Sequence, residues 1–291
     1  VLRLFLIAFG LMTLAGCDST AFDPFVEQTD HFSLAGVLDA SADTQFVRVS
    51  RVRLTADFDP RPIDATVTLL DERSGAAKTL QDSVYAFGRG RQATNYALTD
   101  FPLELGGAYR LTVEATDGRR ASAQVELPDS VPEPVLLIPA RTPYQVVTVR
   151  TQDKLVALDL IYTYRLESDP PAARRVQRVP YFDAVSRTPA GVYGAQVNVG
   201  VDISNILPSA DLARERLVML DIEVFFALAS SSWPDIELLT DEDAAIPNLV
   251  DNVEGGVGFV GGIASKRLSW CEIRPAFLAP PCDDEQLPGR R

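Results

Sequence analysis

The sequence predicts a mainly β chain, with an N-terminal immunoglobulin-like β-sandwich over residues 31–127 and a second β-rich domain with minor helix over residues 144–291. Three observations favour this class. Apolar residues recur at alternate positions in short runs, these runs follow one another about every ten residues, and no helical stretch separates the runs of the first domain. The Cys-Trp-Cys core of a true immunoglobulin domain is missing from the sequence.

The clearest strand pair lies on either side of Asp117-Gly118, a dipeptide that favours tight hairpin turns. Alternating apolar residues before and after it predict strands over residues 109–115 and 121–127. The same alternation predicts four earlier strands, at residues 32–38, 46–54, 65–70 and 96–98.

A proline-rich segment over residues 128–143 marks the expected linker, because proline cannot donate a hydrogen bond to a strand ladder. Beyond it, apolar and β-branched runs predict further strands, and two short segments predict helices. The strands are expected at residues 145–150, 155–167, 192–203 and 217–228, and the helices at residues 210–216 and 234–240.

The first residues predict export and lipidation. An apolar run too short for a permanent spanning helix follows Arg3, and Leu14-Ala15-Gly16-Cys17 resembles a bacterial lipobox. We expect a signal peptide over residues 1–16, a lipid on Cys17 and a polar tether over residues 17–30. The alternative is an ordinary secretory signal with a chance cysteine. Lipidation predicts a membrane-anchored protein of the cell envelope, at the outer membrane on its periplasmic or surface face.

Cys271 and Cys282 are the remaining cysteines, and an even number in an exported chain indicates a disulfide. Such a bridge closes a short proline-rich loop and contributes about 2–3 kcal/mol. We do not expect a zinc site, because these two cysteines and the only histidine, His31, do not make a set of zinc ligands. The net charge of −13 argues against nucleic acid as a partner.

Residues Gly256-Val-Gly-Phe-Val-Gly261 match the glycine fingerprint of a dinucleotide-binding turn. That fingerprint requires a following helix and a second parallel strand, and the short proline-rich remainder of the chain has no room for them. We therefore expect no nucleotide cofactor. The glycines are expected on a late strand or bulge of the second domain, with Phe259 buried, where another backbone or an aromatic ring approaches closely.

The sequence carries no strong catalytic signature, and we expect no catalytic residues and no cofactor. His31 lies ahead of the first strand, where a satisfied or exposed side chain is the simpler interpretation. Neither a Gly-x-Ser-x-Gly nor a His-Glu-x-x-His motif occurs. Asp241 and Asp243 are a weak calcium candidate, because their segment lacks the glycine of an EF-hand loop. Clusters of carboxylates leave open the alternative that the protein is a hydrolase.

Arginine groups and aromatic side chains offer two binding hypotheses. The arginines are suited to binding anionic glycans, although a position on the outward face of a strand explains them equally well. The aromatic side chains are suited to stacking on sugar rings, although more of them are expected in the core. The arginines are Arg48, Arg51, Arg53, Arg89, Arg91, Arg174, Arg175 and Arg178. The aromatics are Tyr85, Phe87, Tyr181, Phe182 and Trp233.

Four features of the sequence occur together: the lipobox, the strand that begins at Phe32, the run over residues 45–51 and the late stretch over residues 252–262. In this combination the chain resembles the envelope lipoproteins of Bacteroidetes-type bacteria that are grouped as domain of unknown function 4249, although Val260 replaces the family's usual aromatic residue. It implies an envelope lipoprotein, often encoded near outer-membrane TonB-dependent receptors, and it supplies no catalytic residues.

The leading hypothesis is therefore a non-enzymatic binding or accessory component that works with such a receptor. The alternative is a carboxylate-dependent glycan or peptide hydrolase at the cell surface.

Overall fold

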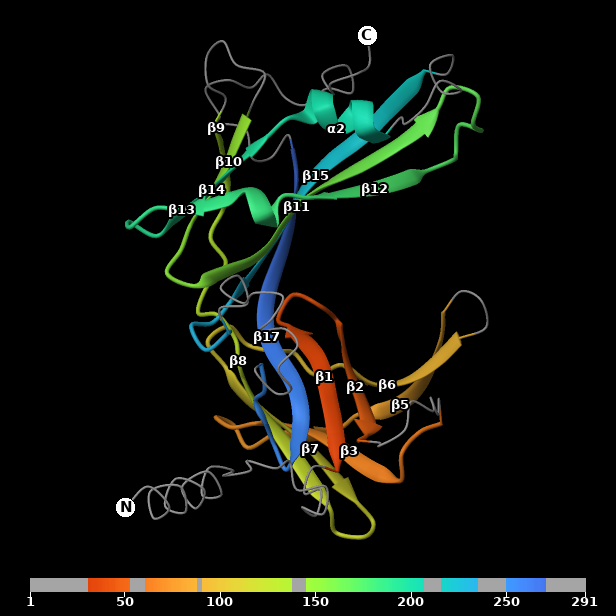
Figure 1. Ribbon diagram of the computed structural model, residues 1–291, viewed down its shortest axis with the longest axis vertical. Coiled ribbons are helices and arrows are strands. Elements are labelled where there is room, and N and C mark those ends of the chain that lie inside the picture. The colour runs from red at the N-terminus through yellow and green to blue at the C-terminus, as the bar shows by residue number, and fades with distance from the viewer. Residues whose placement is uncertain are drawn as a thin grey trace, which may run out of the picture.

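A computed structural model describes residues 31–52, 61–87, 91–137, 145–206, 216–234 and 250–270. The mainly β fold class is confirmed, because the regular structure there consists of strands in three sheets, the short helix η2 (Phe182–Ala184) and the helix α2 (Val199–Ile206). No helix in this part of the chain is long and apolar enough to cross a bilayer. Figure 1 shows two lobes, one above the other, which share the long strand β17.

An eight-stranded sheet runs through both lobes (Figure 1). Its central strand, β17, is antiparallel to β15 of the upper lobe and parallel to β1 of the lower lobe. The order across the sheet is β12 (Arg175–Pro180), β11 (Lys154–Leu166), β15 (Leu217–Ala229), β17 (Gly256–Ser269), β1 (Phe32–Asp39), β2 (Thr44–Arg51), β6 (Arg91–Thr99) and β5 (Gln81–Phe87).

In the lower lobe, a five-stranded sheet packs against this long sheet and forms the expected β-sandwich. Alternate residues of both sheets meet in one apolar core, in which Phe32, Leu34 and Tyr109 are almost completely buried. The order of the second sheet is β16 (Val253–Glu254), β8 (Arg120–Glu126), β7 (Ala108–Ala115), β3 (Ala65–Asp71) and β4 (Ala77–Thr79).

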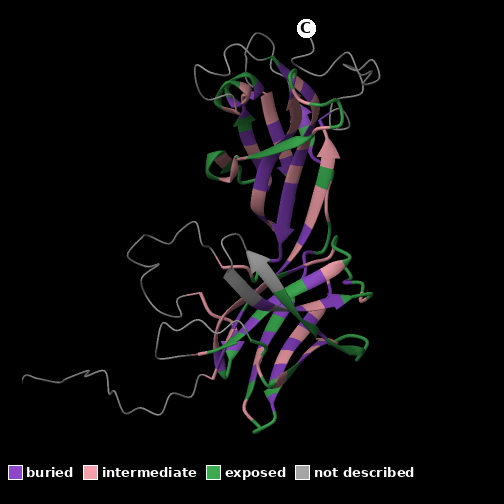
Figure 2. Cartoon of the chain, turned by 90° about the vertical axis from the view of Figure 1, so that its right-hand side faces the viewer, coloured by how far each residue is buried: buried purple, intermediate pink, exposed green. Residues whose placement is uncertain are grey.

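In the upper lobe, a four-stranded sheet packs on the long sheet around a second core that includes Trp270, Tyr162 and Phe226. Its order is β13 (Val185–Arg187), β14 (Val192–Val197), β10 (Gln145–Arg150) and β9 (Val135–Leu137). Val260 belongs to the lower core and Leu268 packs against the upper one. Their even spacing on β17 places both cores on the same side of the long sheet, and Figure 2 shows buried positions along the strands of both lobes.

The glycines at the start of β17 permit close approach of neighbouring backbone. Gly256, Gly258 and Gly262 pair with Phe32, Leu34 and Leu38 of β1. Each of these large core residues therefore lies beside a position on β17 that has no side chain. A Cβ added at Gly258, where φ is +116°, would lie 2.2 Å from the Leu34 carbonyl oxygen. The glycines therefore lie inside a late strand, as predicted, and not at a strand-to-helix turn.

Asn252 braces the same strand through its side-chain amide. Its Oδ1 accepts a hydrogen bond from the Val260 N–H at 2.9 Å, and its Nδ2 donates to the Val260 carbonyl at 2.8 Å and to the Gln124 carbonyl at 3.1 Å. One side chain thus ties β17 to β8 of the opposing sheet. This contact supports the corner at Gly255, where φ is +72° and the chain passes from one sheet to the other.

Several expectations need correction. The glycine stretch was expected in the domain over residues 144–291, but all of Gly256–Gly261 pairs with β1 of the lower lobe. Phe259 was expected to be buried and is only half-buried, because the alternation of β17 turns Val260 into the core instead. The expected linker over residues 128–143 includes a strand, since Val135–Leu137 forms β9.

The strand expected over residues 192–203 ends at Val197, and α2 follows it. Asn198 explains the change, because its Oδ1 accepts a hydrogen bond from the Val201 N–H at 3.1 Å and caps the helix.

Candidate functional site

A hollow of about 660 Å³ opens in the upper lobe, where β11 begins beside η2, β13 and the turn after β15. Its volume falls within the range of small-molecule sites, roughly 300–1,000 Å³. The residues that line it, here called the aromatic pocket, are Lys154, Leu155, Val156, Phe182, Asp183, Val185, Arg187, Tyr193, Trp233 and Pro234.

Strand alternation at β13 divides the neighbouring side chains between two hollows. Val185 and Arg187 line the aromatic pocket, whereas Ala184 and Ser186 line a second hollow on the other side. Successive side chains of a strand point to opposite faces, so this short strand forms a shared wall. Tyr193 of β14 reaches the aromatic pocket from the inner side of the four-stranded sheet.

Trp233 is held in place from several directions. Its ring meets the Phe259 ring edge to face, with centroids 5.1 Å apart, and its carbonyl oxygen accepts a hydrogen bond from the Lys154 ammonium. A Cβ added at Gly261 would lie 2.1 Å from the indole, so the missing side chain is what lets the ring approach β17. A third, smaller hollow of about 170 Å³ also borders Trp233, between the two lobes.

Positive charge lies on the wall of the aromatic pocket. The Arg187 guanidinium carbon lies 5.0 Å from the centroid of the Tyr193 ring, a cation–π contact, and this arginine makes no ion pair with any described residue. The Tyr193 hydroxyl donates to the Asp153 carbonyl at 3.2 Å, which fixes the ring beneath the guanidinium. Lys154 supplies the second cation.

Two carboxylates lie at or near the aromatic pocket. Asp183 lines it and is exposed, whereas Asp153 lies next to Lys154 and is half-buried. Burial raises the pKa of Asp153 above its ordinary value, and the negative charge of Asp129 raises it further. No group of three or more metal-ligating side chains occurs among the residues that the structure describes.

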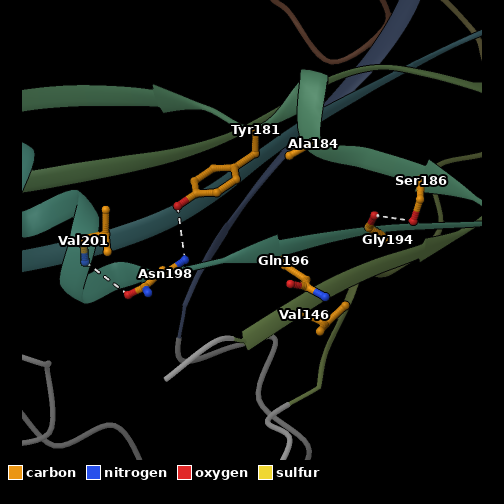
Figure 3. A pocket seen from close by; sticks show the side chains of 8 residues that line it. All are labelled: Val146, Tyr181, Ala184, Ser186, Gly194, Gln196, Asn198 and Val201. Carbon is orange, nitrogen blue, oxygen red and sulfur yellow. Dashed lines mark hydrogen bonds between the residues drawn. The ribbon is translucent and has the colours of Figure 1, made fainter. Parts of the chain in front are cut away.

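The second hollow, here called the outer groove, has a volume of about 630 Å³ and lies on the outer face of the four-stranded sheet. Its lining residues are Val146, Tyr181, Ala184, Ser186, Gly194, Gln196, Asn198 and Val201. Figure 3 shows that much of its polar surface is already paired, because the Ser186 hydroxyl donates to the Gly194 carbonyl and the Tyr181 hydroxyl accepts from the Asn198 N–H. The outer groove therefore presents fewer open groups than the aromatic pocket.

A buried carboxylate lies behind the outer groove. Asp202 of α2 is 5% exposed and accepts hydrogen bonds from the hydroxyls of Tyr162, at 2.5 Å, and Tyr181, at 2.7 Å. These contacts attach α2 to β11 and to the segment before η2. Burial, aided by the bond to Asp202, raises the pKa of both phenols, so they remain protonated donors.

The structure places the sequence-predicted residues unevenly. Phe182 and Trp233, which are far apart in the chain, meet in the aromatic pocket, and Tyr181 lines the outer groove. Arg175 and Arg178 pair with Asp169 and Asp159 instead of lining a pocket. The following lie outside the described residues: Cys17, Arg53, Arg89, Asp241, Asp243, Cys271, Cys282, the side chains of Tyr85, Phe87 and Arg91, and all but one end residue of each helix expected at 210–216 and 234–240.

Lys154, Arg187 and Tyr193 had not been singled out in the sequence. Tyr193 follows the alternation of its strand, but no sequence signal distinguishes Lys154 or Arg187 from other surface cations.

We expect Cys271 and Cys282 to form a disulfide, and thiol labelling of unreduced, denatured protein that has been exported to an oxidising compartment tests this pairing. Neither cysteine should react before reduction, and both should react after it. Two labelled thiols before reduction would contradict the bridge.

The fold and its sites define a mainly β protein with a β-sandwich and with surface hollows in its upper lobe. The chain belongs to the family described as Domain of unknown function (DUF4249), whose model matches residues 20–182. A comparison with curated proteins found no match.

Two solved structures show a limited likeness. One, described as a cytokine receptor complex, is 13% identical over 67% of this chain and 89% of its own, with a TM-score of 0.23. The other, the FN1-FN3 domains of chicken CNTN1, is 9% identical over 69% of this chain and 61% of its own, with a TM-score of 0.24. A likeness of this extent carries no information on ligand or partner.

Proposed function

We propose that this protein is a non-enzymatic binding component of the bacterial cell envelope, anchored by lipid at Cys17 and working with an outer-membrane receptor. The observation that carries the binding role is the aromatic pocket, where Phe182, Tyr193 and Trp233 stand beside the cations of Lys154 and Arg187. Concave sites that combine apolar walls with a few placed polar groups are typical of ligand capture.

The composition of the pocket wall favours binding over hydrolysis. Acid–base cleavage of a glycosidic bond by carboxylates uses two of them across the reacting bond. Among the described residues that line the pocket, Asp183 is the one carboxylate, and the charged groups beside it are cations. A wall of this kind suits recognition of a ligand better than catalysis, which needs one carboxylate to donate a proton and another to accept one.

The envelope location and the receptor are supported by the sequence. Leu14-Ala15-Gly16-Cys17 supports a lipid anchor, and the resemblance to envelope lipoproteins supports a TonB-dependent receptor as partner. One acyl chain gives only marginal membrane binding, so a stable anchor needs the several chains that bacterial lipoproteins of this type carry.

We expect the tagged full-length protein to copurify with an outer-membrane receptor from detergent-solubilised envelopes of its host. Quantitative mass spectrometry should enrich one receptor over a matched membrane lipoprotein used as bait. Recovery of no receptor in several detergents, together with turnover of a glycan or peptide that Asp183→Asn abolishes, would replace the binding role with the hydrolase alternative.

We expect Cys17→Ala to release the protein from membranes, since the variant loses its acylation site. Sedimentation and palmitate labelling measure this release, and Cys271→Ala serves as the matched control that should remain bound. A Cys17→Ala variant that still sediments with membranes and still takes up palmitate would contradict the lipid anchor.

A further inference from the structure

We propose that the aromatic pocket binds a carboxylate-bearing sugar residue, such as a hexuronate within an oligosaccharide. This inference rests on the proposed binding role and names its ligand class. It combines three features of the pocket: rigid aromatic side chains, a cation without an ion-pair partner among the described residues, and a single exposed carboxylate.

The aromatic side chains provide apolar surface for the C–H bonds of a sugar ring. An aromatic face carries partial negative charge and attracts the partially positive C–H hydrogens. Trp233 is fixed by Phe259, Gly261 and the bond from Lys154, and Tyr193 is fixed by its bond to the Asp153 carbonyl. Trp233 therefore offers an immobilised ring for stacking, and a ligand that stacks on it loses little additional side-chain entropy. Tyr193 instead holds the Arg187 guanidinium in place.

The cations specify the carboxylate. Arg187 stacks its guanidinium over Tyr193 at 5.0 Å, an arrangement that orients the plane of the group and leaves its N–H edge for an acceptor. A planar guanidinium fits a carboxylate with two parallel hydrogen bonds. Lys154 places a second positive charge on the same pocket wall, although its ammonium already donates to the Trp233 carbonyl.

The charge of the whole chain limits how anionic the ligand is. The net charge of −13 repels a polyanion at long range, whereas two local cations accommodate one carboxylate. Asp183 on the same wall accepts hydrogen bonds and therefore suits a ligand rich in hydroxyl donors. A uronate ring presents several hydroxyl donors beside its carboxylate, whereas an ionised acidic side chain presents none beside its own, so the pocket favours the saccharide.

Isothermal calorimetry on the detergent-extracted full-length protein tests this inference with three probes: a hexuronate trisaccharide, a neutral hexose trisaccharide of the same linkage, and an acidic tripeptide. We expect saturable binding of the hexuronate, about tenfold or more tighter than the neutral sugar, as one charge-assisted contact predicts. Arg187→Gln should remove most of that preference, and Phe182→Leu should weaken both sugars.

Arg120→Gln is the matched control, because Arg120 is exposed on β8 and lines none of the three hollows. It should leave hexuronate affinity unchanged, and thermal melting should show that all variants are folded. The inference is overturned by equal affinity for both sugars, by unchanged preference in folded Arg187→Gln, by tighter binding of the tripeptide, or by no binding at all. Copurification with the receptor is measured separately, so a wrong ligand class would not contradict the proposed binding role.

Discussion

Replacing Gly258 with alanine is expected to lower the free energy of unfolding by roughly 3–5 kcal/mol, combining backbone strain with overpacking. The φ of +116° is unfavourable for any residue with a Cβ, and that Cβ would lie 2.2 Å from the Leu34 carbonyl oxygen. The obstacle is backbone in the adjacent strand, so a rotamer change cannot relieve it. Urea denaturation of the purified protein measures the loss.

Gly118→Ala separates the cost of backbone strain from the cost of the steric clash with the neighbouring strand. Gly118 also has a positive φ, +86°, but a Cβ there would meet nothing within 4 Å. This control should lose only about 1 kcal/mol, the usual cost of giving a side chain to a left-handed position. Similar losses in the two variants would show that the close approach of β1 and β17 has no energetic consequence.

Asp202→Ala is expected to lower the free energy of unfolding by roughly 2–5 kcal/mol, because it leaves two phenol hydroxyls without their acceptor. The Tyr162 side chain is completely buried, so water cannot replace the carboxylate there without rearrangement. Tyr181→Phe removes one donor, leaves the carboxylate paired with Tyr162, and should be milder. A larger loss in Tyr181→Phe than in Asp202→Ala would contradict the central role of the carboxylate.

The same cluster predicts sensitivity to alkali. Burial raises the pKa of Tyr162 and Tyr181 in the folded protein above the ordinary value of 10.0, which the unfolded chain retains. The unfolded state therefore releases protons first as pH increases, so this stabilisation is complete below about pH 10 and falls progressively above it. Tyr162→Phe should flatten the decline in unfolding free energy between neutral pH and pH 11, as urea denaturation at each pH will measure.

Strand alternation allowed much of the fold to be predicted from the sequence. The hairpin around Asp117-Gly118 and the long strands β11 and β15 lie close to where the apolar pattern places them. The long-range pairing of β1 with β17 was not predictable, because Phe32 and Gly256 are separated by 224 positions in the sequence and no local signal connects them. Helix α2 was also missed, since Val199 and Val201 continue a strand-like pattern and only the Asn198 cap ends it.

The candidate site was predictable only in part. The sequence indicated Phe182 and Trp233 as aromatic candidates, but their meeting depends on the pairing of sheets that bring η2 next to the end of β15. Arg187 gains its role from its place above Tyr193, a contact across paired strands that single-sequence periodicity does not specify. The glycines of β17 were understood as close-approach positions, whereas the ring that approaches Gly261 became known only from the fold.

The parallel pairing of β1 and β17 has a mechanical consequence. β1 begins at Phe32, next to the proposed tether, and β17 leads in the same direction into the upper lobe. Tension between a membrane anchor and a load held by the upper lobe would pull these strands past each other along their axes. All eight residue pairs from Phe32↔Gly256 to Asp39↔Ile263 then share the force at once, instead of separating one after another. The lower lobe would thus transmit force between the membrane and the pocket with these two strands loaded in shear, the direction in which the pair resists separation most.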